Sequence, residues 1–198
     1  ALYSTRPPPL GVVAHDWSAA AIDRTEYLVR RNPASALRAL RALPWTALVE
    51  AGPGFARDLA LSLGAAQALV ESAARRGLRH VHVHSCGRAA LIAALAERLG
   101  GPSYSLTLHG PLSDYGPGQG FKWRHARFAA VITARLLAEV AAALGEDRPP
   151  RLVVQPMGVD TARFRREAPY EPRRPNEALR LFSCARLNAA KGFPDLLA

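Results

Sequence analysis

The sequence predicts an α/β fold in which strands alternate with helices. Four short stretches after Gly77 have the alternation or the apolar content of strands, and two stretches between them have helical spacing. The predicted strands are 78–84, 104–108, 129–133 and 152–155, and the predicted helices are 89–99 and 136–144. This order is typical of parallel βαβ units. Ligands bind such sheets beyond the carboxyl ends of the strands, so we expect the functional residues at that edge.

The part of the chain before Gly77 is predicted to be mainly helical. Residues 1–16 are rich in proline and predicted to be irregular. Apolar spacing predicts helices over 17–31, 33–43 and 53–76, the last one relaxed at Gly64. These helices are compatible with an α/β fold but indicate no function.

Length and charge limit the class of protein. The 198 residues are enough for one large domain or slightly more. The chain starts without Met and ends in an apolar helix opening, so we expect a piece of a longer polypeptide. The net charge of +10 favours anionic partners, whether nucleotide sugars, acidic lipid headgroups or nucleic acid. The arginines are scattered rather than interleaved with aromatic residues, which argues against nucleic acid.

Cysteine content and hydropathy favour a reducing compartment. Cys86 and Cys184 have neither a disulfide framework nor a metal-ligand spacing. No apolar run reaches the roughly 18 to 20 residues that a membrane span needs. We expect a cytoplasmic protein, with peripheral contact to the inner face of the plasma membrane left open.

The last quarter of the chain contains a turn, a linker and another predicted strand. The fourth strand ends in the turn Gly158-Val-Asp160. Residues 158–178 are rich in arginine and proline and have the composition of a linker. Residues 179–185 are predicted as the next strand, which opens into a loop just before a new helix. The pattern indicates a crossing from one domain into another.

Arg186 and Lys191 lie five residues apart in that loop and form a candidate anion site. The start of a helix has unpaired N–H groups and partial positive charge, which favour phosphate. Arg186 adds a planar fork that binds phosphate through two hydrogen bonds, and Lys191 adds a point charge. The alternative is a solvated pair of surface side chains, which is common for isolated basic residues.

These motifs resemble those of the retaining glycosyltransferases of family 4. In this chain, Met157 stands where the family usually has Asn, and Ala185 stands where it usually has Gly. The resemblance implies a GT-B fold of two Rossmann-like domains. By this resemblance the chain comprises an acceptor-side N-terminal domain in 1–157 that is incomplete at its start, an interdomain linker in 158–178, and the truncated beginning of the donor-binding C-terminal domain, with its first strand, in 179–198.

The resemblance also implies an activity. Enzymes of this family transfer a sugar, here expected to be a hexosyl group, from a nucleotide-diphosphate-sugar donor to an acceptor hydroxyl with retention. No metal or other cofactor is expected, and the implied partners are a nucleotide sugar and a glycan or lipid-linked acceptor of bacterial polysaccharide or glycolipid assembly. Arg186 and Lys191 would bind the donor diphosphate, and Asp160 would be a turn residue at the hinge.

Two other functional classes are compatible with the sequence. The charge suggests a basic nucleic-acid-binding module, and the strand order suggests a non-catalytic Rossmann-like domain. If the glycosyltransferase interpretation holds, residues 1–198 alone are expected to have no transferase activity, because a GT-B site needs two facing domains.

His109 is the candidate catalytic residue. It follows the strand 104–108, where an imidazole can donate to or accept from a ligand, although a lone histidine there is more often structural. Thr107, His109 and Gly110 match the Thr-x-His-Gly motif of the family. The resemblance implies that His109 hydrogen-bonds the transferred sugar and faces the acceptor.

His80, His82 and His84 alternate along one strand and therefore share one face. Successive members stand about 6 to 7 Å apart, which disfavours convergence on one metal ion. The stretch His82-Val-His84 resembles the His-x-His strand of the family. The cleft is expected to be lined by His84, Ser85, Gly110 and Gly158: Ser85 and Gly158 follow predicted strands, and the resemblance places His84 and Ser85 nearest the cleft and Gly110 in the motif of His109.

Residues 110–120 are predicted to form a mobile loop over the cleft. The loop is rich in glycine, but it lacks the spacing of a dinucleotide or Walker phosphate loop. Lys122, just after it, is a secondary phosphate candidate.

Overall fold

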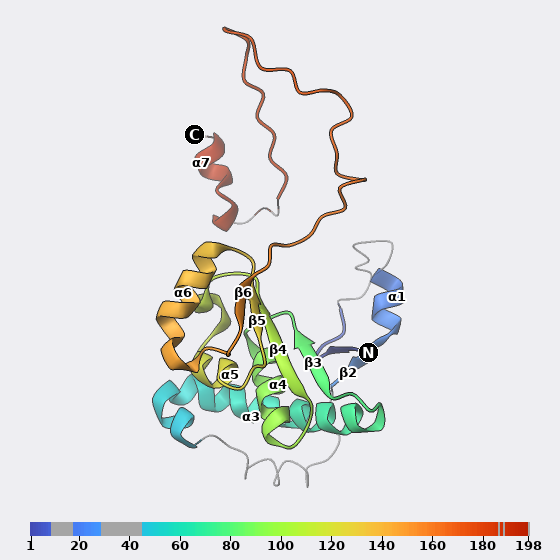
Figure 1. Cartoon of the computed structure of the whole chain (residues 1–198), viewed down its shortest axis with the longest axis vertical. Coiled ribbons are helices and arrows are strands. Elements are labelled where there is room, and N and C mark those ends of the chain that lie inside the picture. The colour runs from blue at the N-terminus through green and yellow to red at the C-terminus, as the bar shows by residue number, and fades with distance from the viewer. Residues whose placement is uncertain (9–17, 29–44, 186, 188, 198) are drawn as a thin grey trace. The chain divides into compact units, whose positions relative to one another are not determined.

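The computed structural model describes residues 1–8, 18–28, 45–185, 187 and 189–197 (Figure 1). These residues divide into two compact units, Ala1–Met157 and Gly158–Ala198. All strands of the described residues belong to the first unit.

The centre of the first unit is a four-stranded parallel sheet with the order β3-β4-β5-β6. Its strands are β3 (His80–Val83), β4 (Ser103–Leu108), β5 (Ala129–Val131) and β6 (Leu152–Val154). The sheet confirms the predicted α/β class with parallel strands, and each strand lies inside its predicted range or within one residue of it. His80 pairs with Ser103 and Ala129 with Leu106, so β3, β4 and β5 end at the same edge.

Two helices between these strands also form as predicted. The helix α4 (Arg88–Arg98) connects β3 to β4 and packs against both strands and α3. Its residues 90–96 are all buried, because the sheet covers one side and a long helix covers the other. The helix α6 (Ala134–Leu144) connects β5 to β6, and the Thr133 hydroxyl accepts from the Leu136 N–H at its start.

The long helix α3 (Trp45–Arg75) begins earlier than predicted and is interrupted at a different place. Gly52 has φ 74° and ψ −174°, which breaks the helical backbone, and Pro53 then opens the next turn. The helix runs through Gly64 without the predicted relaxation. Downstream of the break, Phe55, Leu59 and Leu69 enter the core.

Near the amino terminus, two strands replace structure that was predicted to be irregular or helical. The strand β1 (Leu2–Ser4) pairs in parallel with β2 (Thr25–Tyr27) in a separate two-stranded sheet. The helix α1 (Ser18–Asp23) therefore ends well before the predicted limit of residue 31. The predicted helix 33–43 lies outside the described residues.

Tertiary contacts explain why β2 forms where the sequence favours helix. The Glu26 carboxylate accepts from the Ser72 hydroxyl at 2.7 Å and pairs with Arg75 and Arg76 at 3.2 and 3.1 Å. These three partners lie at the end of α3 or just after it, 46 to 50 residues away in sequence. A local sequence pattern carries no information about such distant partners.

The connection from β4 to β5 is more ordered than the predicted mobile loop. It contains the 3₁₀ helix η1 (Leu112–Tyr115) and the short helix α5 (Gln119–Trp123). Trp123 is fully buried, and the Tyr104 hydroxyl donates to the Lys122 carbonyl at 3.0 Å. A further 3₁₀ helix, η2 (Gly145–Asp147), follows α6.

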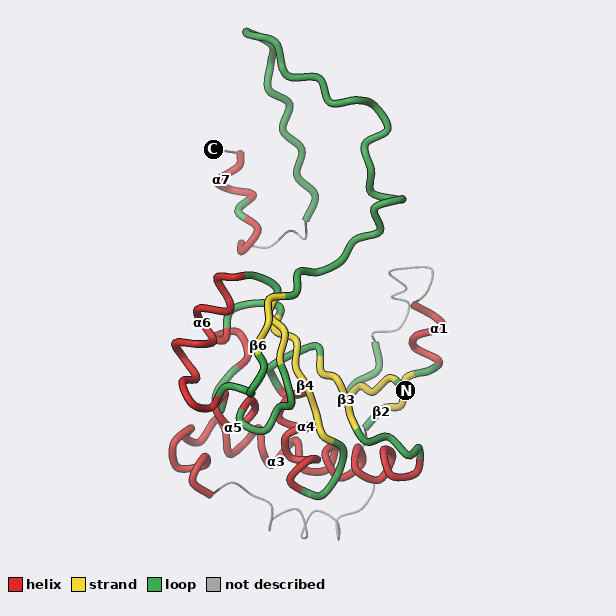
Figure 2. Tube along the Cα trace, viewed as in Figure 1, coloured by secondary structure: helices red, strands yellow, loops and turns green. Residues whose placement is uncertain are grey.

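The second unit has little regular structure (Figure 2). Its elements are η3 (Ala189–Lys191) and α7 (Phe193–Leu197). The strand predicted at 179–185 is not formed, and those residues are exposed. A strand needs a neighbour for its N–H and C=O groups, and the described part of this unit offers none.

Among the described residues, no helix combines the length and apolarity needed to cross a membrane.

Candidate functional site

Two histidines meet at the carboxyl edge of the central sheet. His84 directly follows β3 and His109 directly follows β4, and the pairing of these strands brings both residues to one place. The His84 Nδ1 lies 3.4 Å from the His109 Nε2, and the two rings stack with centroids 5.6 Å apart. One nitrogen must donate and the other must accept, so the two imidazoles share one hydrogen bond.

The environment of His109 favours its neutral form. The pKa of His109 is lowered from its ordinary value, first by burial and then by the nearby His84. Two positive charges at this separation repel each other. When both imidazoles are neutral, the hydrogen-bonded pair has one further donor nitrogen and one further acceptor nitrogen.

Two glycines near this pair, Gly87 and Gly110, lie beside the Tyr115 ring. A Cβ on Gly110 would lie 3.6 Å from the Tyr115 hydroxyl oxygen, and a Cβ on Gly87 would lie 3.6 Å from the Tyr115 Cδ1. The Ser85 hydroxyl accepts from the Gly87 N–H at 3.2 Å and so shapes the turn at Gly87. Burial raises the pKa of Tyr115, while a hydrogen bond to the His109 backbone acts in the opposite direction.

Tyr115 was not identified from the sequence. It lies in a glycine-rich stretch without helical or strand periodicity, so its position beside His109 depends on the folded connection between β4 and β5. The preceding residue, Asp114, also approaches Gly110, with the Asp114 Oδ2 3.7 Å from a Cβ placed there.

Lys122 supports this connection from inside the core. Its side chain is only 2% exposed, and its Nζ donates to the Tyr115 carbonyl at 2.8 Å. Burial lowers the pKa of Lys122 to about 8, partly opposed by Asp58 and Cys86. The structure thus contradicts the interpretation of Lys122 as a phosphate ligand, because its ammonium is buried and bound to the backbone.

We refer to His84, Ser85, His109 and Gly110 as the strand-end cluster. The first unit brings these four predicted residues together at one edge of the sheet. The other predicted residues belong to the second unit. There Gly158 is exposed, and the Asp160 Oδ1 accepts from the N–H groups of Ala162 and Arg163 at 2.9 and 3.2 Å, in a turn.

The candidate anion site is only partly described. Arg186 lies outside the described residues, and Lys191 is exposed at the end of η3. The helix α7 begins two residues after Lys191, close to where the sequence predicts one. The pairing of Arg186 with Lys191 therefore stays a sequence prediction.

His80 and His82 bind hydroxyl groups on β4 rather than a common centre. The His80 Nδ1 and Nε2 lie 2.8 Å from the hydroxyl oxygens of Ser103 and Ser105. The His82 Nδ1 lies 2.7 Å from the Ser105 oxygen, and its Nε2 lies 2.8 Å from the Thr107 oxygen. Within the described ranges, no group of three or more His, Cys, Asp or Glu side chains has the arrangement of a metal site.

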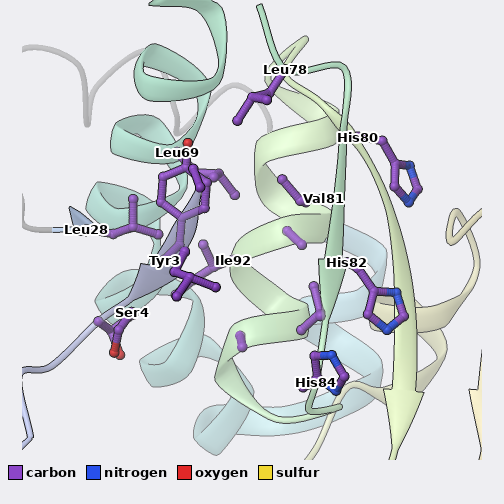
Figure 3. Close-up of a pocket in the computed structure, with 16 residues that line it drawn as sticks. Tyr3, Ser4, Leu28, Leu69, Leu78, His80, Val81, His82, His84 and Ile92 are labelled. Atoms are coloured by element: carbon purple, nitrogen blue, oxygen red, sulfur yellow. The ribbon is translucent and has the colours of Figure 1, made fainter. Parts of the chain in front are cut away.

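A pocket of about 590 Å³ lies on the other side of β3 (Figure 3). Its lining includes Tyr3 of β1, Leu28 directly after β2, Leu69 of α3 and Ile92 of α4. His80, His82 and His84 also belong to the lining, although Figure 3 shows their imidazoles projecting away from these apolar side chains.

No protein-family model matches the sequence, and no curated protein matches it. The functional argument therefore depends on the residues and their arrangement.

Proposed function

We propose that this chain is part of a retaining glycosyltransferase of the GT-B type, which transfers a hexosyl group from a nucleotide-diphosphate sugar to an acceptor hydroxyl. Support comes from the parallel α/β sheet and from the segments Thr107-x-His109-Gly110 and Gly158-Val-Asp160. The first unit would be the acceptor-side domain. The basic segment from Arg186 to Lys191 would belong to the donor-binding domain.

The observation that carries the proposal is the pairing of His109 with His84 at the carboxyl edge of β4 and β3. Ligands of parallel sheets bind at this edge. A neutral imidazole pair offers one donor and one acceptor, which suits the hydroxyl groups of a sugar. Gly110 carries no side chain, which lets the Tyr115 hydroxyl and the Asp114 carboxylate lie close to the backbone after His109.

The proposed reaction uses residues of two sites. His109 would orient the transferred sugar and the acceptor hydroxyl. As the sugar approaches an oxocarbenium-like state, negative charge would develop on the departing diphosphate. Arg186 and Lys191 would stabilise that charge, and removing one such donor typically costs about 10² to 10³ in rate.

A ligand titration followed by NMR tests the role of His109. We would titrate the ¹⁵N-labelled chain with uridine, guanosine and adenosine diphosphate hexoses and, separately, with the same diphosphates without hexose. We expect the hexose-bearing compounds to shift the ring signals of His109 and His84, because only they place hydroxyl groups at the strand-end cluster. The His109→Ala variant should keep its fold and lose the hexose-dependent shift of His84.

His125, an exposed histidine elsewhere in the first unit, is the internal control, and its ring signals should not move. Shifts caused equally by diphosphates with and without hexose would contradict a sugar-binding role for His109. So would an unchanged response in His109→Ala.

A further inference from the structure

The side chains of β3 and β4 form a continuous chain of imidazoles and hydroxyls that leads to the strand-end cluster. We call His80, His82, Ser103, Ser105 and Thr107 the imidazole–hydroxyl ladder. Its four hydrogen bonds measure 2.7 to 2.8 Å, and each imidazole uses both of its nitrogens. Ser105 and Thr107 are 0% and 8% exposed, so these hydroxyls depend on protein partners.

One further hydrogen bond determines the direction of the ladder, that is, which atom donates the proton in each of its hydrogen bonds. The Ser103 hydroxyl donates its single proton to the Arg79 carbonyl at 3.1 Å. The His80 Nδ1 must then donate to the Ser103 oxygen, because that oxygen has no second proton to give. In a neutral imidazole the Nε2 is consequently an acceptor, and it takes the proton of the Ser105 hydroxyl.

The same reasoning applies to the next imidazole. The Ser105 proton is used toward His80, so the His82 Nδ1 must donate to the Ser105 oxygen. The His82 Nε2 then accepts the proton of the Thr107 hydroxyl. Thr107 has no other proton to donate, and its oxygen is left as an acceptor.

We propose that the ladder holds the Thr107 hydroxyl as an acceptor-only group beside the strand-end cluster, which makes His82 and Ser105 positioning residues for a ligand hydroxyl. By continuation of the β3–β4 register, Thr107 stands opposite His84, and it lies two residues before His109 on the same strand. An oxygen that only accepts favours a donor such as a sugar hydroxyl and disfavours an anion. The ligand class rests on the proposed function, whereas the direction of the ladder does not.

The ladder keeps this direction only while both imidazoles are neutral. The pKa of His82 is lowered by burial and then by His84, His80 and His109, and that of His80 by burial and then by Arg127. The Phe128 ring stacks on both imidazoles, with centroids 6.2 and 6.0 Å away. Protonation of His82 would make both of its nitrogens donors, so the Thr107 hydroxyl would turn and become a donor toward the cluster.

The tautomers of the two imidazoles give a direct test. Long-range ¹H–¹⁵N correlation spectra of the ¹⁵N-labelled chain at pH 7.5 distinguish Nδ1–H from Nε2–H. We expect His80 and His82 to be mainly Nδ1–H, whereas the exposed His125 should be mainly Nε2–H, the form favoured in water. Predominantly Nε2–H signals from His80 and His82 would overturn the proposal without any variant.

Variants test the direction. Ser105→Ala removes the acceptor of the His82 Nδ1, so His82 should change to Nε2–H while His80 stays Nδ1–H, held by Ser103. Thr107→Val removes only the terminal donor, so His82 should stay Nδ1–H. A ladder without direction would respond equally to both substitutions, and that result would refute the assignment.

A buried serine outside the ladder provides the matched control. Ser62 lies in α3, is fully buried, and its hydroxyl makes no hydrogen bond within the described structure. Ser62→Ala should leave both tautomers unchanged. None of these spectra needs a ligand, so failure of the ladder and failure of the glycosyltransferase proposal give different results.

Discussion

At the scale of single residues, the contact between His84 and His109 depends on strand register. The two residues are 25 positions apart, yet the parallel pairing of β3 with β4 places their ring nitrogens 3.4 Å apart. Sequence reasoning placed both residues at strand ends, but it did not predict a direct contact. Together with burial, this contact lowers the pKa of His109.

The first prediction concerns the His109 pKa. Replacing His84 by Asn removes a neighbouring positive charge, so the pKa of His109 should rise toward its usual value and stay below it, because burial remains the larger cause. An NMR titration of the His109 ring protons between pH 4.5 and 8.5 measures the change. An unchanged or lower pKa in the variant would contradict the proposed electrostatic coupling, and His125 serves as the reference signal.

The second prediction concerns Lys122. Its folded pKa of about 8 is below the ordinary value of 10.5, so the unfolded chain binds more protons between these values. The contribution of Lys122 to folding stability should therefore increase as pH rises through this window, by roughly 3 kcal/mol.

Urea denaturation of the wild type and of Lys122→Met at pH 7, 8.5 and 9.5 separates this effect from other titrating groups. The wild-type free energy of unfolding should rise relative to that of the variant as the pH increases. Parallel pH dependences would show that Lys122 is not a buried ammonium.

At the scale of elements, local periodicity predicted β3 to β6, α4 and α6, because each of these elements alternates or spaces its apolar residues against one core. It did not predict β2, which is held by the partners of Glu26 on and after α3. It also predicted a strand at 179–185 that has no neighbour in the described structure. The misses therefore involve contacts that are distant in sequence.

The residues of the candidate site also fall into those that the sequence predicts and those that depend on distant contacts. Strand-end residues such as His109 and Ser85 could be found from their places after predicted strands. Tyr115 and the buried side chain of Lys122 could not, since both positions depend on how η1 and α5 pack.

The third prediction tests the packing of the β4–β5 connection. Gly118 has φ 71° and a left-handed conformation, and a Cβ there would lie 2.1 Å from a ring carbon of the buried Phe55. Gly118→Ala should lower the free energy of unfolding by about 2 to 5 kcal/mol, from backbone strain and overpacking together.

Gly54→Ala is the matched control because Gly54 is helical and the nearest atom, on Pro117, would be 4.0 Å from its new Cβ. Alanine at a helical position should be neutral or stabilising by up to about 1 kcal/mol. Equal effects of the two substitutions, measured by urea denaturation, would contradict the described packing of Gly118 against Phe55.

At the scale of the whole molecule, the two units differ in secondary structure and burial. The first has a parallel sheet, a buried core and the strand-end cluster, whereas the second is mainly exposed loop with the basic segment that ends at Lys191. In the proposed enzyme, the first would contact the sugar and the acceptor, and the second would begin the diphosphate site. The net charge of +10 is compatible with an anionic donor but does not select one.

The most direct test of the glycosyltransferase proposal is calorimetric titration of the chain with nucleoside diphosphates and with the corresponding nucleosides. The wild type is compared with two double variants. One combines Arg186→Ala with Lys191→Ala. The other combines Arg165→Ala with Arg166→Ala, two exposed residues of the same unit, and is a control with the same change in charge. The first double variant should lose diphosphate affinity by about 1.5 to 3 kcal/mol, roughly 10- to 150-fold, while the control and the nucleoside titrations change little. Equal diphosphate affinities of the wild type and the Arg186→Ala, Lys191→Ala variant would contradict the account.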